Sequence, residues 1–318
     1  MKIKPFLWCL VLGLFFLVTS CNKDESAGQE IIKDGSNLRV VGYLPEYRMG
    51  AIHDDMFDYV TDIVYFSIET EANGDLILRE SSIADIMRLN QMIGARDVHL
   101  FVSVGGWLRS AYFGEMALSD SARGNFVNNI TDFCLTQGLD GADIDWEFPN
   151  GPDEVEAEQW LFRDLNLAFE EHGLMLTTAQ ASLASISEES LRWAHRVHIM
   201  SYENPGRHAT FSDAVGDVRF FEMKNIEPHR LFLGVPFFGR NLADRTPYTY
   251  ADIFSMYSPA PDEDEVEGIY FNNINTIRQK TRYAIDEDLG GIMIWELGQD
   301  IQGEKSLLKA IYDEKNRR

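Results

Sequence analysis

Three carboxylates alternate along one short apolar run, LDGADIDWEFP, at residues 139–149. In a β-strand alternate side chains lie on the same face, so Asp143, Asp145 and Glu147 point in one direction. Carboxylates this close cannot all stay ionised at low cost, and at least one proton is retained near neutral pH. We therefore expect Glu147, the last of the three, to act as a general acid while Asp145 keeps its negative charge.

Three other interpretations of these acids are a solvated acidic strand, a calcium-binding loop and a buried cluster without chemistry. The large apolar residues between the acids disfavour the solvated strand. Asp143, Asp145, Glu147 and Glu154 fall at positions 1, 3, 5 and 12 of a calcium loop, but Phe148 occupies the position that requires glycine. We therefore expect no metal site.

Short apolar runs recur after residue 38 and are separated by amphipathic stretches. The runs predict eight strands, at residues 40–44, 63–68, 98–104, 141–146, 174–181, 197–200, 231–237 and 291–295. Apolar residues spaced three and four apart predict helices at residues 83–93, 122–134, 157–170, 211–223, 274–285 and 305–312. Such alternation over about 280 residues favours a parallel (β/α)8 barrel, the TIM barrel of the α/β class. An open doubly wound sheet is the alternative, but no glycine-rich phosphate loop follows the first strand.

A barrel would fix where the three acids lie. One face of each strand points to the barrel axis and the other packs on the helices, so the acids face the axis. Glu147 is then nearest the carboxyl mouth, where enzymes of this fold carry their active sites.

The first twenty residues have the pattern of an export signal. Two lysines precede an apolar run at residues 6–18 that is too short for a comfortable membrane span. The run ends in LVTSC, which resembles the bacterial lipobox, so we expect cleavage before Cys21 and attachment of a lipid anchor to it. We expect residues 21–38 to form a flexible tether and residues 39–318 the folded domain. We then expect a cell-envelope lipoprotein held at the outer membrane, on its inner face or exposed at the cell surface.

The charge and the cysteine content limit the substrates and disulfides that this chain can have. A formal net charge of −23 repels nucleic acid and anionic polymers, so a neutral substrate fits better. Cys9 leaves with the signal and Cys21 takes lipid, so Cys134 has no partner for an internal disulfide. We expect a monomer without a cofactor, and an exposed acidic loop at residues 259–268.

The run LDGADIDWEFP resembles the signature D-G-x-D-x-D-W-E of the family 18 glycoside hydrolases, the chitinase family. Every specified position is filled, by Asp140, Gly141, Asp143, Asp145, Trp146 and Glu147. The likeness extends over most of residues 39–315. VVGYLPEYR resembles the family's first strand, FVSVGGW the third, IMSYEN the sixth, LFLGVPFFGR the seventh and GGIMIWELGQD the eighth.

The resemblance implies substrate-assisted, retaining hydrolysis of β-1,4-linked N-acetylglucosamine. Glu147 would protonate the glycosidic oxygen, and the sugar's own N-acetyl oxygen would attack the anomeric carbon. Asp145 would hydrogen-bond the acetamide N–H, and Tyr202 would donate its hydroxyl to the acetamide oxygen.

The resemblance also implies residues that support the acids and hold the sugar. Asp143 would exchange a proton or a hydrogen bond with Asp145, supported by Tyr43 and Ser103. Trp295 would form the floor of the sugar subsite, with Trp107 as a further platform. The implied substrate-binding residues are Tyr43, Ser103, Trp107, Met200, Glu203 and Trp295.

Two positions depart from the family pattern. The aspartate after the sixth-strand tyrosine is Glu203, one methylene longer, and the tyrosine of P-F-Y-G-R is Phe238, which lacks the hydroxyl. Both change how the sugar hydroxyls are held. Roughly fifty residues separate the seventh and eighth strands, too few for the α+β domain that deepens the cleft of many chitinases, so we expect a shallow, open groove.

Three functions fit these residues. The first is hydrolysis of chitin or chitooligosaccharides, and the second is endo-β-N-acetylglucosaminidase activity on the chitobiose core of N-glycans. The third is a catalytically silent chitin-binding lectin on the same barrel. W-E-F-P after Asp145 favours the first, and the presence of Glu147 argues against the lectin.

Overall fold

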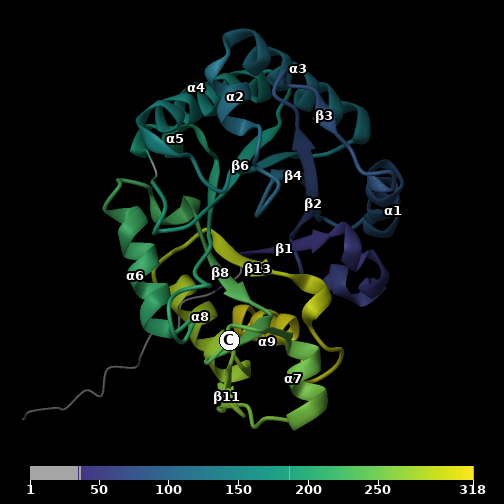
Figure 1. The fold of residues 1–318 in the computed structure, drawn as a ribbon. Coiled ribbons are helices and arrows are strands. Elements are labelled where there is room, and N and C mark those ends of the chain that lie inside the picture. Colours follow the sequence, from purple (N-terminus) through teal and green to yellow (C-terminus); the bar gives the residue numbers. More distant parts are fainter. Residues whose placement is uncertain (1–34, 36, 186, 318) are drawn as a thin grey trace, which may run out of the picture. The chain divides into compact units, whose positions relative to one another are not determined.

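The computed structural model describes residues 35, 37–185 and 187–317 (Figure 1). The predicted signal, Cys21 and most of the predicted tether lie outside these residues. In the described part of the chain, no helix is both long and apolar enough to cross a membrane.

Eight parallel strands close into a barrel, so the predicted (β/α)8 fold is confirmed. The closure is made by β1, which pairs with β2 on one side and with β13 on the other. All eight predicted strands are present, within a few residues of the expected bounds. The barrel strands are β1 Arg39–Pro45, β2 Asp62–Thr70, β4 His99–Gly105, β5 Gly141–Asp145, β6 Met175–Gln180, β7 Arg196–Ile199, β8 Leu231–Pro236 and β13 Gly291–Trp295. A two-residue strand, β3 (Leu76–Ile77), adds to the end of β2.

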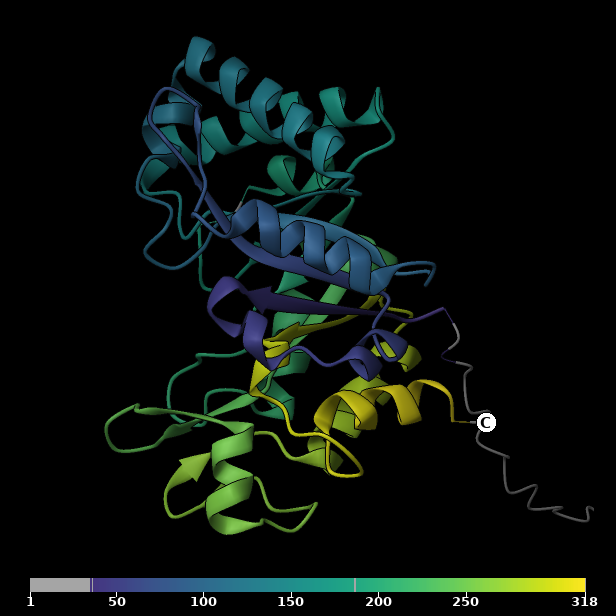
Figure 2. The ribbon, with the colours of Figure 1, turned by 90° about the vertical axis from the view of Figure 1, so that its right-hand side faces the viewer.

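Helices surround the barrel, and the six predicted ones are present (Figures 1 and 2). Short helices α2, α5 and α7 escaped the periodicity analysis because each spans about two turns or fewer. Between β1 and β2 the described chain forms 3-10 turns at Glu46–Ala51 and Asp54–Asp58 in place of an α-helix. The α-helices are α1 Ser82–Ile93, α2 Phe113–Leu118, α3 Asp120–Gln137, α4 Gly151–Glu170, α5 Glu188–Trp193, α6 Phe211–Glu222, α7 Tyr250–Tyr257, α8 Ile274–Asp286 and α9 Leu307–Lys315.

A small antiparallel sheet lies between β8 and α8 in the sequence and beside the barrel in space (Figure 2). It consists of β9 Phe238–Asn241, β10 Pro247–Thr249, β11 Glu265–Val266 and β12 Ile269–Tyr270, in the order β10-β9-β12-β11. The expectation of a plain acidic loop at 259–268 is therefore wrong in part. Backbone pairing of Glu265 with Tyr270 draws the end of that segment into the sheet.

Successive side chains of β5 point alternately to the hydrophobic core under the helices and to the barrel interior. Ala142 and Ile144 join the large apolar cluster between barrel and helices, whereas Asp143 and Asp145 point to the interior. Trp146 follows outward and stacks on Phe113 of α2, with ring centroids 5.3 Å apart. This packing anchors the strand that carries the acids.

Two glycines allow β4 to lie close to that strand. Gly105 and Gly106 have φ values of +98° and +102°, which side chains rarely adopt. A Cβ on Gly105 would collide with the Asp145 carbonyl oxygen, and one on Gly106 with the Phe66 ring. The Gly106 N–H donates to the Asp145 carbonyl oxygen at 2.7 Å, which fixes the end of β5.

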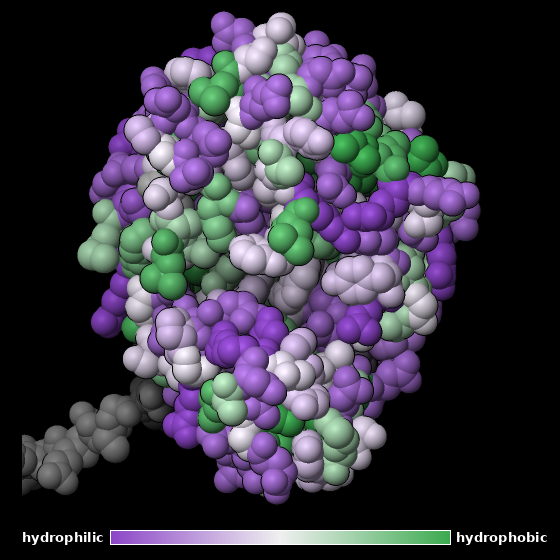
Figure 3. Space-filling model, in the orientation of Figure 1, coloured by the Kyte–Doolittle hydropathy of each residue, from purple (hydrophilic) through white to green (hydrophobic). Residues whose placement is uncertain are grey.

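The surface is largely hydrophilic on the face shown in Figure 3, and hydrophobic residues there gather in small separate patches. This agrees with the formal charge of −23, because acidic residues outnumber basic ones 51 to 28.

Candidate active site

A cavity of about 680 Å³ opens at the carboxyl ends of the barrel strands. Most of the predicted site residues line its wall, namely Tyr43, Trp107, Asp145, Glu147, Met200, Tyr202, Glu203 and Trp295. Ser103 and Asp143 do not reach this wall, because both are fully buried below it. The volume is that of a pocket that holds a small ligand or a few sugar rings.

Asp145 and Glu147 both face the cavity. Asp145 is 3% exposed, and its Oδ1 has no hydrogen-bond partner among the described residues. Burial raises the pKa of Asp145 well above its usual range, and the charges of Glu147 and Asp143 raise it further. Burial also raises the pKa of Glu147 to about 7, although the Trp107 backbone N–H opposes the shift.

The two acids therefore retain a proton near neutral pH, as a general acid requires. The sequence predicts an ionised Asp145 beside a protonated Glu147. The deeper burial of Asp145 raises its pKa as well, so the two acids compete for protons.

Ser110 holds the backbone of both acids and was not predicted. Its hydroxyl accepts a hydrogen bond from the Glu147 N–H at 3.0 Å and lies 3.1 Å from the Asp145 carbonyl oxygen. Ser110 follows the third-strand motif by a few residues, and no pattern in the sequence points to this contact.

Asp143 lies below the cavity in a network of short hydrogen bonds. Tyr43 donates its hydroxyl to Oδ2 at 2.7 Å, and Thr177 donates to Oδ1 at 2.6 Å. The His198 Nδ1 lies 3.2 Å from Oδ1. Tyr43 therefore contacts Asp143 directly, whereas the Ser103 Oγ has no hydrogen-bond partner in the described chain.

Thr177 and His198 escaped the sequence analysis because they belong to other strands. Thr177 is the register partner of Asp143 across the β5–β6 pair, and His198 lies on β7. Their positions follow from barrel register, although both face inward by the same alternation that places the acids.

Aromatic rings form one side of the cavity. Trp295 meets Phe66 edge to face, with centroids 4.7 Å apart, and lies 5.8 Å from the Tyr43 ring. These contacts hold the indole at the end of β13, where it lines the cavity. Trp107 is 66% exposed at the rim, so its ring is free to take an apolar sugar face.

Two arginines hold Glu203, which also lines the cavity. Arg240 of β9 forms a bidentate pair with the Glu203 carboxylate, with Nε at 2.9 Å from Oε1, and Arg245 donates to Oε2 at 2.9 Å. Glu203 has φ of +64°, a conformation uncommon for a residue with a side chain. The small sheet thereby supplies Arg240, which lines the cavity, and the turn between β9 and β10 supplies Arg245. The sequence predicted neither contact.

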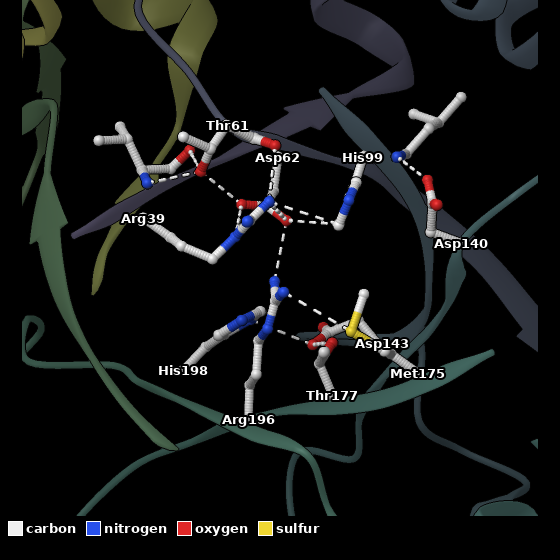
Figure 4. A network of polar contacts seen from close by, with 12 residues as sticks. Arg39, Thr61, Asp62, His99, Asp140, Asp143, Met175, Thr177, Arg196 and His198 are labelled. Atoms are coloured by element: carbon white, nitrogen blue, oxygen red, sulfur yellow. Dashed lines mark hydrogen bonds and ion pairs between the residues drawn. The ribbon is translucent and has the colours of Figure 1, made fainter. Parts of the chain in front are cut away.

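A second polar network occupies the amino end of the barrel (Figure 4). Asp62 is fully buried and accepts hydrogen bonds from Arg39 Nε at 2.8 Å and Arg196 Nη1 at 2.8 Å. Burial acts to raise the pKa of Asp62, but the hydrogen bonds and charges of the two arginines outweigh it and leave that pKa lowered. The network closes the end of the barrel opposite the cavity.

The calcium-loop interpretation is wrong. Residues 141–145 form a strand, and Glu154 lies in helix α4, where its carboxylate accepts the Asn150 N–H at 2.8 Å. Across the described residues, no group of three or more histidine, cysteine or acidic side chains is arranged to hold a metal ion.

A parallel barrel that presents two buried, proton-holding carboxylates and aromatic walls at its carboxyl mouth has the construction of a sugar-cleaving barrel enzyme. The chain belongs to the glycosyl hydrolases family 18, whose family model matches residues 39–300.

Known proteins support this assignment. "Probable chitinase 2" of Drosophila melanogaster is 24% identical over 273 residues, which cover 64% of this chain and 56% of the relative. The chain spans about half the length of the first curated relatives it matches. The family 18 chitinase ChiB from the chitin utilization locus of Flavobacterium johnsoniae is 28% identical, with a TM-score of 0.80 over 88% of this chain and 94% of that one.

A chitinase from Cycas revoluta, solved in complex with (GlcNAc)4, has the same fold, with a TM-score of 0.76 over 87% of this chain and 99% of that one. Its sequence is 20% identical to this chain. Homologous structures of this fold thus bind chitooligosaccharides.

Proposed function

We propose that this protein hydrolyses β-1,4-linked N-acetylglucosamine, in chitin or chitooligosaccharides, with the substrate's own N-acetyl group as the nucleophile. The observation that carries the proposal is the placement of Glu147, Asp145 and Tyr202 on one cavity wall. Glu147 has a pKa of about 7 because it is buried, which suits a residue that must give up a proton near neutral pH.

In the proposed reaction, Glu147 gives its proton to the glycosidic oxygen as the bond to the anomeric carbon breaks. The carbonyl oxygen of the N-acetyl group attacks that carbon, so an oxazolinium ion forms and no side chain becomes covalently attached. Glu147 then takes a proton from the water that opens this ion. The product retains the anomeric configuration.

Asp145 and Tyr202 orient the acetamide. Oδ1 of Asp145, unpartnered within the described chain, is a free acceptor for the acetamide N–H. Burial raises the pKa of Tyr202 well above its usual range, as do the charges of Asp145 and Glu147. Tyr202 therefore stays protonated and can donate to the acetamide oxygen.

The remaining predicted residues would hold the sugar ring. Trp295 would lie under the apolar face of the ring, and Tyr43 would support the indole from below. Trp107 would extend the platform outward, while Met200 and Glu203 would contact the ring edge.

A panel of defined substrates tests the proposal. We expect cleavage of chitooligosaccharides with retained configuration, seen by NMR of the first-formed anomer. Release of a trimmed glycan from a chitobiose-core glycopeptide, with chitooligosaccharides untouched, would make the protein an endo-β-N-acetylglucosaminidase. Binding without any cleavage would make it a lectin.

We also propose that Cys21 carries a lipid anchor, on the basis of the lipobox-like sequence LVTSC. The full chain should partition into the detergent phase of a Triton X-114 extract, and the Cys21→Ala variant should stay in the aqueous phase. Equal partition of both chains would argue against the anchor. Protease digestion of whole cells would test exposure at the cell surface.

A further inference from the structure

His198 is a buried histidine that takes no part in the proposed reaction. It lies on β7 (Arg196–Ile199), and 1% of its surface is exposed. Its Nδ1 lies 2.8 Å from the Tyr43 hydroxyl oxygen and 3.2 Å from the Asp143 Oδ1. Figure 4 shows His198 together with Asp143 and Thr177 in the barrel interior.

The geometry around Asp143 shows which atoms must donate. The Tyr43 hydroxyl donates to Oδ2 at 2.7 Å and the Thr177 hydroxyl to Oδ1 at 2.6 Å. Once Tyr43 gives its only hydrogen to Asp143, its oxygen can act only as an acceptor toward His198. Nδ1 therefore faces two acceptors, and a bare nitrogen there would place lone pair against lone pair.

The surroundings of the other ring nitrogen, Nε2, also indicate that the hydrogen is on Nδ1. Nε2 is buried and has no hydrogen-bond partner among the residues the structure describes. Orphaned N–H groups are rare in protein interiors, whereas an unpaired acceptor is tolerated somewhat better. The edge of the ring also packs against Phe232, with centroids 5.3 Å apart, an apolar contact that suits an uncharged imidazole.

We propose that His198 is a positioning residue that carries its hydrogen on Nδ1 and acts as the third donor to the Tyr43–Asp143 pair. In this role it stabilises negative charge on Asp143 and keeps that carboxylate turned away from the cavity. The proton that the reaction uses then remains on Glu147 and does not move to Asp143. The inference rests on the proposed function for its kinetic consequences, but the tautomer itself does not.

The groups that face His198 are few. Tyr43 comes from β1 and Asp143 from β5, and Phe232 of β8 is uncharged. Arg196, two residues earlier on the same strand, is engaged by Asp62 of β2, which also lies 3.6 Å from His99 of β4. Asp145 and Tyr202, which line the cavity, lie on the side of His198 that faces the carboxyl end of the barrel.

Paired substitutions at His198 test the kinetic role. The amide nitrogen of His198→Asn can donate from the position of Nδ1, so this variant should keep the wild-type pH profile. His198→Leu removes the donor, so the ionised form of Asp143 is held less well and its charge raises the pKa of Asp145 less. Because Asp145 acts as an anion in the proposed reaction, we expect the acidic limb of the kcat profile of His198→Leu on a chitooligosaccharide to shift down by about one pH unit, with KM nearly unchanged.

His195→Asn is the matched control. His195 lies just before the same strand, its Nδ1 accepts the Leu176 N–H at 3.0 Å, and no contact joins it to Asp143. The control should leave the pH profile unmoved. A wild-type profile in His198→Leu, or the same shift in His198→Asn and His198→Leu, would overturn the proposal.

A spectroscopic measurement keeps the proposal testable if His198→Leu does not fold. In the ¹⁵N-histidine-labelled wild-type protein, the neutral ring of His198 should carry its hydrogen on Nδ1 and leave Nε2 bare. A hydrogen on Nε2 with a bare Nδ1 would refute the assignment. Failure of the wild-type protein to cleave any substrate would instead refute the proposed function and leave this result intact.

Discussion

The barrel interior holds buried carboxylates at both ends, and the groups that surround them differ in charge. We call them the amino-end cluster and the carboxyl-end cluster. At the amino end, the carboxylate of Asp62 lies between the guanidinium groups of Arg39 and Arg196, each at 2.8 Å. At the carboxyl end, Asp145 and Glu147 have no ion pair with any described arginine or lysine, and face each other and Asp143 instead.

Burial alone does not decide what a carboxylate does. Both clusters are buried, yet the pKa of Asp62 is lowered while those of Asp145 and Glu147 are raised. The difference lies in the arginines, whose charge compensates the loss of water around Asp62. The amino-end cluster is therefore structural, and the carboxyl-end cluster can exchange protons with a substrate.

The largest effect should follow from removing the proton donor. Glu147→Gln keeps the shape of the side chain but cannot protonate the glycosidic oxygen, so kcat should fall at least about 10³-fold. Binding of a chitooligosaccharide, measured by calorimetry, should persist. Glu154→Gln, on the nearby helix α4, is the control and should keep full activity. Turnover unchanged in Glu147→Gln would remove this residue from the mechanism.

Asp145→Asn should have the next largest effect. The amide cannot carry the negative charge that stabilises the oxazolinium ion, so kcat should fall about 10²–10³-fold. Steady-state kinetics on a soluble chitooligosaccharide measure the loss. A decrease below tenfold would mean that Asp145 does not clamp the acetamide.

The sequence predicts the carboxyl-end acids better than their partners, for a physical reason. Strand alternation is local, so the spacing of Asp143, Asp145 and Glu147 is enough to place them on one face. Thr177 and His198 approach Asp143 through the register of three separate strands. Their contacts depend on how the barrel closes, which no local pattern records.

Other features escape local patterns for different reasons. Ser103 is in register with Asp143 across β4 and β5, but its Oγ has no hydrogen-bond partner in the described chain, so its role stays a prediction. The small sheet was missed because its strands are two to four residues long and have too few positions for a period to show. The arginines that hold Glu203 come from this sheet and its first turn.

Asp62→Asn should affect stability rather than chemistry. The substitution leaves Arg39 and Arg196 without a counter-charge, and the partial exposure of Arg39 softens the penalty, so we expect a loss of about 2–3 kcal/mol in the free energy of unfolding. Urea denaturation would measure it. Asp313→Asn, which breaks an exposed pair with Lys309, should cost at most about 0.5 kcal/mol. A large loss of kcat with unchanged stability would contradict the division between the clusters.

The smallest effect should appear in how stability depends on pH. The pKa of Glu147 rises from 4.5 to about 7 on folding because of burial, so the folded protein binds the proton more tightly than the unfolded chain. The free energy of unfolding should therefore fall as pH rises from about 4.5 to about 7. Asp62 has the opposite effect: its pKa is lowered in the folded protein, so its contribution to stability is lost when the pH falls below the usual pKa of an aspartate.

The variant Glu147→Gln removes the first of these two opposed dependences and leaves the second. The free energy of unfolding of Glu147→Gln minus that of wild type should be about 1–2 kcal/mol larger at pH 8 than at pH 4.5. Denaturant titrations of both proteins at the two pH values give this difference, with Glu154→Gln as the matched control. Equal pH dependence in wild type and Glu147→Gln would mean that the carboxyl-end acids are no more costly to ionise than those at the surface, and the contrast between the two clusters would fail.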